Sequence, residues 1–465
     1  MTGSDRLPRP TCVGPLKGGL RDWAFGSPTA ERLAARGYVI EEFVVEGLAC
    51  RYAASADAAV ADGGGVGTIR EGAEFYRTRV YVLTPKDRSA FNGVLIANWQ
   101  NVSRNMDVGA PDGDEIYRGY AWAGITTQRL GIEGKPGEMP GLVEWDRERY
   151  RGLTHPGDAY SYDIFAQTAR LLKDGPGEAK PDPLRGLRPA MVVAAGRSQS
   201  AMRLGSYLSY AHHHDRLFDA FLLVVHFGIC PPLGEPDFWS LFAADEFGRY
   251  PAQSKLSDAG DAKILAVSTE CEALYNFAAR QPDTNGYRFW EIAGASHSNP
   301  DRDQALKLIF ERDGVSKALS DTAPLSTLEY QQIKDAALRW LVQWRANGAA
   351  PPRFPPISID FDGTGRPQIR RDQIGNSLGG IRMPAVAASG GIYLGSLHAA
   401  LPESLQGYAR QFSRAELTAI HGSEAAFLQS WQRAIDQLEG LDLLTAEESS
   451  CLRSDASFRM RPERS

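Results

Sequence analysis

The chain has 465 residues and a formal net charge of −6, and its 43% hydrophobic and 23% charged residues are ordinary for a globular protein. This acidic balance offers no basic patch for nucleic acid or for an anionic membrane surface. No apolar run approaches the roughly 18–20 residues of a membrane span, and the N-terminus lacks the apolar core of a secretory signal. The five cysteines are scattered, with no C-x-x-C pair, which predicts reduced thiols in a cytoplasmic protein.

The predicted elements begin after about 40 residues of irregular lead-in. Apolar alternation and short buried runs predict strands, and apolar residues at helical spacing predict helices. In chain order we expect strands at 42–52, 75–84, 93–99 and 120–127, a helix at 160–173, a strand at 191–195, a helix at 200–212, strands at 218–226, 263–269 and 287–292, and a helix at 327–347.

The order of these elements predicts an α/β fold. Early strands follow one another without helices, whereas the middle of the chain alternates strand and helix, which is typical of a parallel sheet covered on both faces. The texture changes near residue 350 to Gly, Pro and charge. We therefore predict a lead-in (1–40), a core (41–348) with a lid-like insertion (229–262), and a C-terminal extension (349–465) packed on the core.

One stretch, MVVAAGRSQSAMRL at 191–204, raises a mechanistic hypothesis. Gly196-Arg197-Ser198-Gln199-Ser200 lies where a buried strand meets a helix. This is the setting of the G-x-S-x-G nucleophile elbow, which exposes the serine oxygen above the carboxyl edge of the sheet. Ser200 stands in place of the second glycine and is still small. The alternative is a loop serine that only caps a helix.

A nucleophilic serine needs a base and an acid, and both follow later in the chain in hydrolases of this kind. Glu270 and Glu272 follow the strand at 263–269, and His297 follows the strand at 287–292. We favour Glu272 as the acid because the orienting carboxylate usually lies a few residues beyond the strand. Glu270 stays open as the alternative, and Asp283 is a weaker one.

The oxyanion hole requires two N–H donors. One is expected from Gln199, next to the nucleophile, and the other from the loop that follows the strand at 93–99. In that loop we expect Asn101 or Gln100, although Asn98 and Asn101 also fit a purely bracing role.

The other histidines carry weaker signals. His212, His213 and His214 are consecutive and indicate a solvated helix end, whereas His226 fits either a pocket wall or the core. No H-E-x-x-H motif and no G-x-G-x-x-G after the first strand occur, so neither a metal nor a dinucleotide cofactor is expected.

With these motifs in place, the chain resembles the serine-dependent α/β-hydrolase superfamily, and more closely a bacterial "α/β hydrolase domain" group. The resemblance runs from about residue 40 onwards and includes the extension. It rests on NWQNVS (98–103), GYAWAGITTQRLGI (119–132), YSYDIFAQTARLL (160–172), DPLRGLRPAMVVAAGRSQSAMRL (182–204), TECEALYNFAARQPD (269–283), RFWEIAGASH (288–297) and GNSLGGIRMP (375–384). It implies Ser198 as nucleophile, His297 as base and an esterase-like activity. An aspartate is expected in the acid segment of that group, where this chain has Glu272.

Two further segments carry hypotheses about the substrate. The aromatic residues of the insertion, Phe238, Trp239, Phe242 and Tyr250, fit either an apolar pocket or ordinary packing. Arg382 of the extension either approaches the site or serves the structure.

Together these residues predict a serine hydrolase that cleaves a carboxylic ester of a small or medium-sized substrate through an acyl-enzyme, without a cofactor. Alternatives with the same triad are an acyltransferase, a cyclase or a lactonase, because the fold supports many chemistries. A peptidase would need a peptide-sized groove. A non-catalytic binding protein would be expected to have a broken triad. The sequence gives no indication of the oligomeric state.

Overall fold

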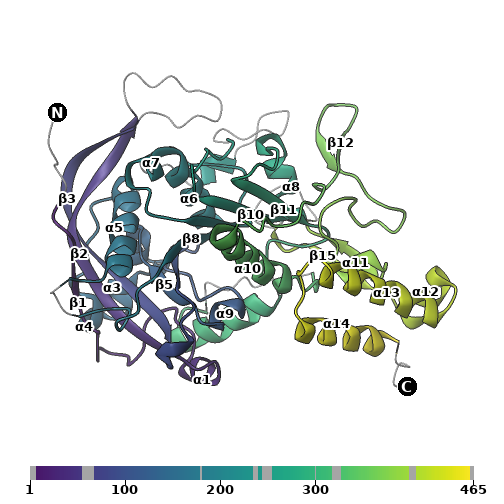
Figure 1. Cartoon of the computed structure of the whole chain (residues 1–465), viewed down its shortest axis with the longest axis horizontal. Coiled ribbons are helices and arrows are strands. Elements are labelled where there is room, and N and C mark those ends of the chain that lie inside the picture. Colours follow the sequence, from purple (N-terminus) through teal and green to yellow (C-terminus); the bar gives the residue numbers. More distant parts are fainter. Residues whose placement is uncertain are drawn as a thin grey trace.

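The computed structural model of the chain describes residues 7–54, 68–177, 181–233, 239–242, 254–298, 300–316, 326–396 and 405–460. Within these residues the main feature is a nine-stranded sheet with the order β1-β2-β3-β5-β4-β8-β9-β10-β11 (Figure 1). Its strands are β1 (Thr11–Val13), β2 (Tyr38–Ala54), β3 (Thr68–Pro85), β4 (Val94–Trp99), β5 (Ala121–Ile125), β8 (Met191–Arg197), β9 (Ala220–Val224), β10 (Lys263–Thr269) and β11 (Tyr287–Ile292).

The sheet has an antiparallel and a parallel part. β1, β2, β3 and β5 pair antiparallel, with β2 and β3 forming a long two-stranded ribbon. From β5 through β4, β8, β9 and β10 to β11 every pair is parallel. The carboxyl ends of β4, β8, β10 and β11 therefore lie along one edge of the sheet, where the sequence placed its candidate residues.

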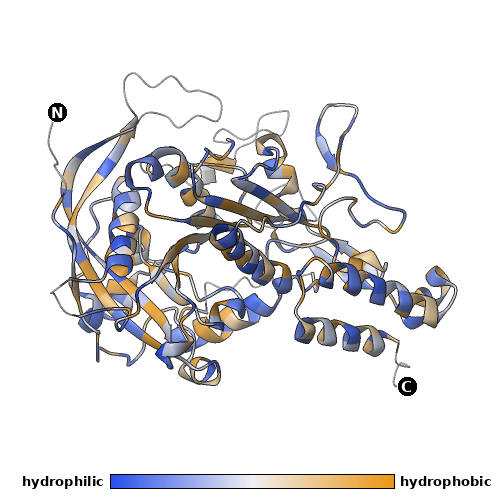
Figure 2. Ribbon diagram, viewed as in Figure 1, coloured by the Kyte–Doolittle hydropathy of each residue, from blue (hydrophilic) through white to orange (hydrophobic). Residues whose placement is uncertain are grey.

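Helices cover both faces of the parallel part, as predicted. On β8, Val192 and Ala194 pack with α5 (Ser161–Asp174) and α6 (Gln199–Tyr210), whereas Val193 packs on the opposite face with α10 (Gln331–Asn347). Figure 2 shows the apolar character of these central strands. The remaining helices are α1 (Ala30–Ala35), α2 (Arg129–Glu133), α3 (Leu142–Trp145), α4 (Arg147–Tyr150), α7 (His212–Asp215), α8 (Glu270–Asn276), α9 (Pro300–Asp313), α11 (Pro384–Ala387), α12 (Arg414–His421), α13 (Glu424–Glu439) and α14 (Ala446–Arg459).

The lead-in is more regular than predicted. β1 pairs with β2, with Cys12 opposite Val45, and the side chain of Thr29 accepts a hydrogen bond from the N–H of Arg32 to cap α1. The sequence pattern missed these elements because β1 is only three residues long and its partner lies more than 30 residues away.

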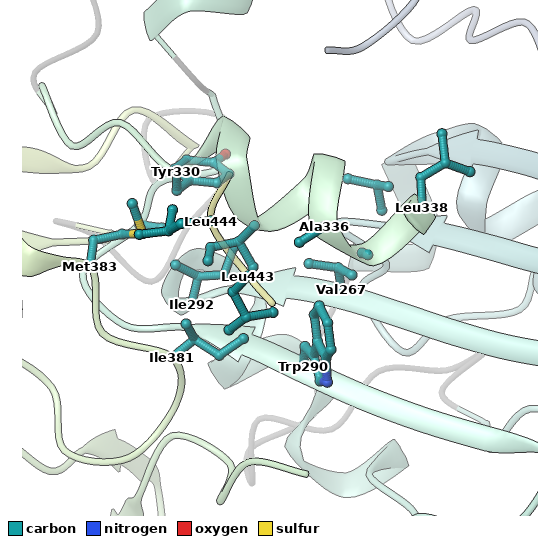
Figure 3. Close-up of a cluster of buried hydrophobic side chains, with 14 of the residues drawn as sticks. Val267, Trp290, Ile292, Tyr330, Ala336, Leu338, Ile381, Met383, Leu443 and Leu444 are labelled. Atoms are coloured by element: carbon teal, nitrogen blue, oxygen red, sulfur yellow. The ribbon is translucent and has the colours of Figure 1, made fainter. Parts of the chain in front are cut away.

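The C-terminal segment after α10 shares the core of the sheet domain. It contains the small pairs β12 (Ile359–Phe361) with β13 (Pro367–Ile369) and β14 (Gly391–Leu394) with β15 (Tyr408–Gln411), besides α11 to α14. A further small pair, β6 (Gly134–Lys135) with β7 (Met139–Pro140), lies in the first half of the chain. Figure 3 shows side chains from both parts in one buried cluster, including Trp290, Ile292, Ile381, Met383, Leu443 and Leu444. The predicted boundaries at residues 40 and 348 stay a prediction, but the packing joins the two parts.

The five cysteines, all among the described residues, form no disulfide with one another. Among the described residues, no helix has both the length and the apolar character that crossing a membrane requires.

The shared core leads to a stability prediction. Ile381 is 1% exposed and packs with Trp290 and Ile292, so Ile381→Ala is expected to lower the free energy of unfolding by about 2–4 kcal/mol. Urea unfolding followed by circular dichroism measures this change. Ile420→Ala is the matched control, because Ile420 is 41% exposed and its loss should change stability by less than about 0.5 kcal/mol. An unchanged main transition in Ile381→Ala would show that the C-terminal segment folds independently.

Candidate active site

Ser198 lies in a sharp turn between β8 and α6, the strand–turn–helix setting expected of a nucleophile elbow. Its φ of 56° and ψ of −122° are rare for a residue with a side chain, and such strain persists only where the surroundings fix it. A Cβ on Gly196 would lie 2.8 Å from the backbone of Ser200, so the turn requires glycine there. Ser198 therefore lies at a strained strand-to-helix turn, as the sequence predicted, and its role as a nucleophile stays a prediction.

Ser200 explains why the second glycine is dispensable. Its hydroxyl accepts a hydrogen bond from the N–H of Arg197 and donates one to the Arg197 carbonyl, both at 2.9 Å. The side chain is 1% exposed and closes the turn from inside. A serine at this position therefore stabilises the bend that a glycine would only permit.

His297 and Glu272 are brought together from the ends of the neighbouring strands β11 and β10. Nδ1 of His297 lies 2.7 Å from Oε1 of Glu272, whose side chain is fully buried. Oε2 of Glu272 accepts the N–H of Thr269 at 2.8 Å and its hydroxyl at 2.7 Å. Glu272 is thus the third residue of α8 in a capping box with Thr269, and the helix start itself aims the carboxylate.

Burial and hydrogen bonding shift the pKa values of Glu272 and His297 in opposite directions. Burial would raise the pKa of Glu272, but the hydrogen bonds from His297 and Thr269 bring it below its ordinary value. Burial lowers the pKa of His297, and the positive charges of Arg197 and Arg302 lower it further, while Glu272 raises it in part. The net result is a histidine that is neutral at pH 7 beside an ionised carboxylate.

The other two acid candidates have different partners. Glu270 accepts hydrogen bonds from the N–H of Gly294 at 2.8 Å and from the Arg371 guanidinium at 2.9 Å. Asp283 accepts the N–H of Phe289 at 3.1 Å, near the start of β11 and thus at the opposite end of the strand from His297. Among the described residues, Glu272 is therefore the acid candidate that reaches the histidine.

The loop after β4 lies against the elbow, and the two backbone N–H groups that were expected as oxyanion donors already have carbonyl partners. The N–H groups of Gln100 and Asn101 donate to the carbonyls of Ile125 and Val108, and the Asn101 amide donates to the Arg197 carbonyl at 2.9 Å. These bonds give Asn101 and Gln100 a bracing role and argue against either as a backbone donor to an oxyanion. The next N–H, that of Val102, points at Oε1 of Gln199 over a long 3.5 Å.

Arg197 joins the elbow to the histidine turn, a role that the sequence did not reveal. Its guanidinium donates to the His297 carbonyl and to Asp112, at 3.3 Å from Oδ2. Lys334 of α10 binds the other oxygen of Asp112 at 2.8 Å, and burial lowers the pKa of this lysine. Asp112 and Lys334 are 85 and 137 residues from Arg197 in the sequence, so no local pattern predicts these contacts. The sequence signal for Arg197 is its position between Gly196 and Ser198.

An apolar cluster borders His297 on another side. Phe227 stacks on the imidazole with a centroid distance of 5.3 Å and an interplanar angle of 29°. Phe242 of the predicted lid packs edge-on against Phe227 at 5.1 Å. Phe238 and Tyr250 lie outside the described residues, and so does the side chain of Trp239.

The remaining candidates serve the structure. Nδ1 of His226 accepts the N–H of Gly228 at 3.0 Å, and burial lowers the pKa of His226 to about 4. His212 is 5% exposed and packs edge-on against Phe221 instead of ending a solvated helix. Arg382 pairs with Asp372 at 2.7 Å within the C-terminal segment.

Two further features of the described residues bear on the candidate site, their capacity to hold a metal ion and a cleft that they line. Within the described part of the chain, no group of three or more His, Cys, Asp or Glu side chains could hold a metal ion. A cleft of about 730 Å³ lies between α1, α9, α10 and α14, and its lining includes Asp112 and Arg302 but not Ser198 or His297.

Comparison with known proteins identifies the family. Residues 12–453 match the family model described as alpha/beta hydrolase domain, whereas no curated protein matches the chain. Solved structures that match include the esterase Est22, with 9% identity over 62% of this chain and 82% of that chain at a TM-score of 0.31. An arylesterase matches with 12% identity over 53% and 81% at 0.29, and oligopeptidase B from Leishmania major with 14% over 61% and 37% at 0.29. Because the family match spans almost the entire sequence, the chain belongs to the alpha/beta hydrolase domain family.

Proposed function

We propose that the protein is a serine hydrolase that cleaves a carboxylic ester of a small or medium-sized organic substrate. Ser198 is the nucleophile, His297 the general base and Glu272 the acid that orients it. The observation that carries this proposal is the 2.7 Å contact between His297 and the buried Glu272, together with the strained elbow that presents Ser198 at the same sheet edge. A binding protein would have no need of a fully buried, ionised carboxylate that is hydrogen-bonded to a histidine.

The chemistry proceeds in two steps. The Ser198 hydroxyl attacks the ester carbonyl while Nε2 of His297 takes its proton, and Glu272 stabilises the imidazolium through Nδ1. The tetrahedral intermediate collapses, the alcohol leaves with the proton from His297, and the acyl group stays on Ser198. Water, activated by His297 in the same way, then releases the acid and regenerates the serine.

The oxyanion of the intermediate needs two N–H donors, and we propose those of Gln199 and Val102. Gln199 is the first residue of α6, and N–H groups in the first turn of a helix have no partner within it. The partial positive charge of the helix start adds to the stabilisation. The long contact from the Val102 N–H to the Gln199 side chain is weak, so an oxyanion can replace it.

The first prediction concerns the nucleophile. A fluorophosphonate probe is expected to add once to the wild-type protein and not to Ser198→Ala, as measured by intact-protein mass. The serine oxygen displaces fluoride from the probe and becomes phosphonylated, a reaction that needs a serine activated by a base. A single adduct on Ser198 therefore tests the proposal without a known substrate. A folded wild type that gains no adduct, or an adduct that persists in Ser198→Ala, would contradict it.

The second prediction concerns the acid. Glu272→Gln is expected to lower the rate of fluorophosphonate labelling or of ester hydrolysis by about 10³- to 10⁴-fold, because a neutral amide cannot stabilise the imidazolium. Glu133→Gln is the control, since Glu133 is an exposed residue of α2. Labelling of Glu272→Gln at the wild-type rate would show that Glu272 is not the acid and that another carboxylate fills this role.

The third prediction concerns pH. Since His297 must be neutral to accept a proton and its pKa lies below the ordinary value of 6.5, kcat/KM is expected to fall as the pH is lowered, with a midpoint below pH 6.5. In Glu272→Gln the midpoint should move lower still, because Glu272 raises the pKa of His297. A wild-type midpoint above 6.5, measured with any ester that the enzyme cleaves, would contradict this assignment.

A further inference from the structure

Glu270 is a buried carboxylate that joins three parts of the molecule. It starts α8 two residues before Glu272 and is 1% exposed. Its Oε2 accepts the N–H of Gly294, whereas its Oε1 accepts the N–H of Gly395 at 3.1 Å and the Arg371 guanidinium at 2.9 Å. One side chain therefore links the helix of the acid, the turn before His297 and the C-terminal segment.

The turn that leads to His297 rests on the same segment. Gly294 has a φ of 72°, and a Cβ there would lie 2.9 Å from the Cβ of Tyr393, so backbone and segment approach closely. The N–H of Ser298 donates to the Leu405 carbonyl at 3.3 Å on the far side of the histidine. His297 is thus held between two contacts with residues more than 90 positions later in the chain.

Arg371 provides the charge that balances Glu270. Its Nη2 binds the carboxylate, and its Nη1 donates to the Gly375 carbonyl at 3.1 Å, so the arginine is fixed by its own turn. A buried carboxylate is costly unless an opposite charge and hydrogen bonds satisfy it. Without Arg371, Glu270 would keep only two backbone donors, and the turns that it joins would be free to move apart.

We propose that Arg371 is a positioning residue for the active site: through Glu270 it fixes the distance between Glu272 and His297. This inference rests on the proposed function, since it assigns Arg371 a role in the same acid–base pair. Arg371 touches neither Ser198 nor His297 in the contacts described above, so its effect passes through Glu270 and Gly294. The pair gives the C-terminal segment a direct share in the geometry of catalysis.

Three variants of the full-length protein test the proposal. Arg371→Met removes the charge, Arg371→Lys keeps it with a single donor group, and Arg382→Met is the matched control. Arg382 is 25% exposed against 30% for Arg371, and it pairs with Asp372 of the same segment instead of Glu270. Thermal unfolding of each variant shows whether the fold is kept.

The first readout is the second-order rate of fluorophosphonate labelling at Ser198. Displacement of a catalytic group by about 1 Å costs on the order of 100-fold, so Arg371→Met is expected to label about 10- to 100-fold more slowly. Arg371→Lys should recover part of the rate, and Arg382→Met should stay within about twofold of wild type. An equal loss in Arg382→Met would overturn the proposal, because it would reflect a general weakening of the segment.

The second readout needs no catalysis. The proton between Nδ1 of His297 and Glu272 is expected as a far-downfield proton resonance, assigned by its absence from His297→Asn. The resonance should move upfield or broaden in Arg371→Met and stay in place in Arg382→Met. A wild-type resonance and labelling rate in Arg371→Met would overturn the proposal.

The two readouts also separate this inference from the proposed function. A wild type without a fluorophosphonate adduct, but with a resonance that responds to Arg371→Met, would remove the hydrolase assignment and keep the positioning contact. If Arg371→Met does not fold, Arg371→Lys carries the test, because the longer, single-donor contact must still shift the resonance. An unshifted resonance in that variant would count against the proposal.

Discussion

The hydrogen bond between His297 and Glu272 is the constraint on which the geometry of the proposed active site depends. It forms because β10 and β11 are parallel neighbours in register, with Thr269 beside Ile292, so the two loops leave the sheet at one edge. Glu272 reaches the histidine with one oxygen because its other oxygen is fixed by Thr269 at the helix start. A local capping motif thereby becomes part of a contact between residues 25 positions apart.

Burial of this pair has two consequences that must be balanced. It strengthens the hydrogen bond, since the surroundings have a low effective dielectric constant, but it disfavours the imidazolium that would form in the proposed proton transfer. Arg197 adds to that cost through its charge while its guanidinium holds the His297 carbonyl in place. In the proposed mechanism Glu272 offsets both effects, so the carboxylate lowers the energy of the imidazolium and also orients the ring.

The fold and the residues at the strand ends could be predicted from the sequence because both leave local patterns in it. The continuous apolar runs at 191–195 and 263–269 are strands buried on both faces, and Ser198, Glu272 and His297 follow such strands within a few residues. The difference between Glu272 and Glu270 also has a local signal in the sequence, the Thr-x-x-Glu capping box at 269–272.

What the sequence could not supply depends on distant partners. The carbonyl of Val108 accepts the N–H of Asn101, which therefore cannot serve an oxyanion. The position of the Arg197 guanidinium depends on Asp112. The change to Gly, Pro and charge near residue 350 predicted an extension packed on the core, but it did not indicate that Leu443 and Leu444 are nearly fully buried in the same cluster as Ile292. Such contacts follow from the packing of whole elements and leave no periodic pattern in one stretch.

The position of His297 explains why a segment so late in the chain bears on the site. β11 is the last strand of the sheet, and an edge strand with unpaired backbone groups frays more easily than an interior one. Ile381 pairs with it, accepting the N–H of Ala293 at 2.9 Å and donating to the Glu291 carbonyl at 2.7 Å. The C-terminal segment thus covers the edge from which the histidine turn emerges. If His297 is the base, as we propose, it keeps its geometry only when this edge of the sheet is closed, and the C-terminal segment is then part of the proposed catalytic scaffold.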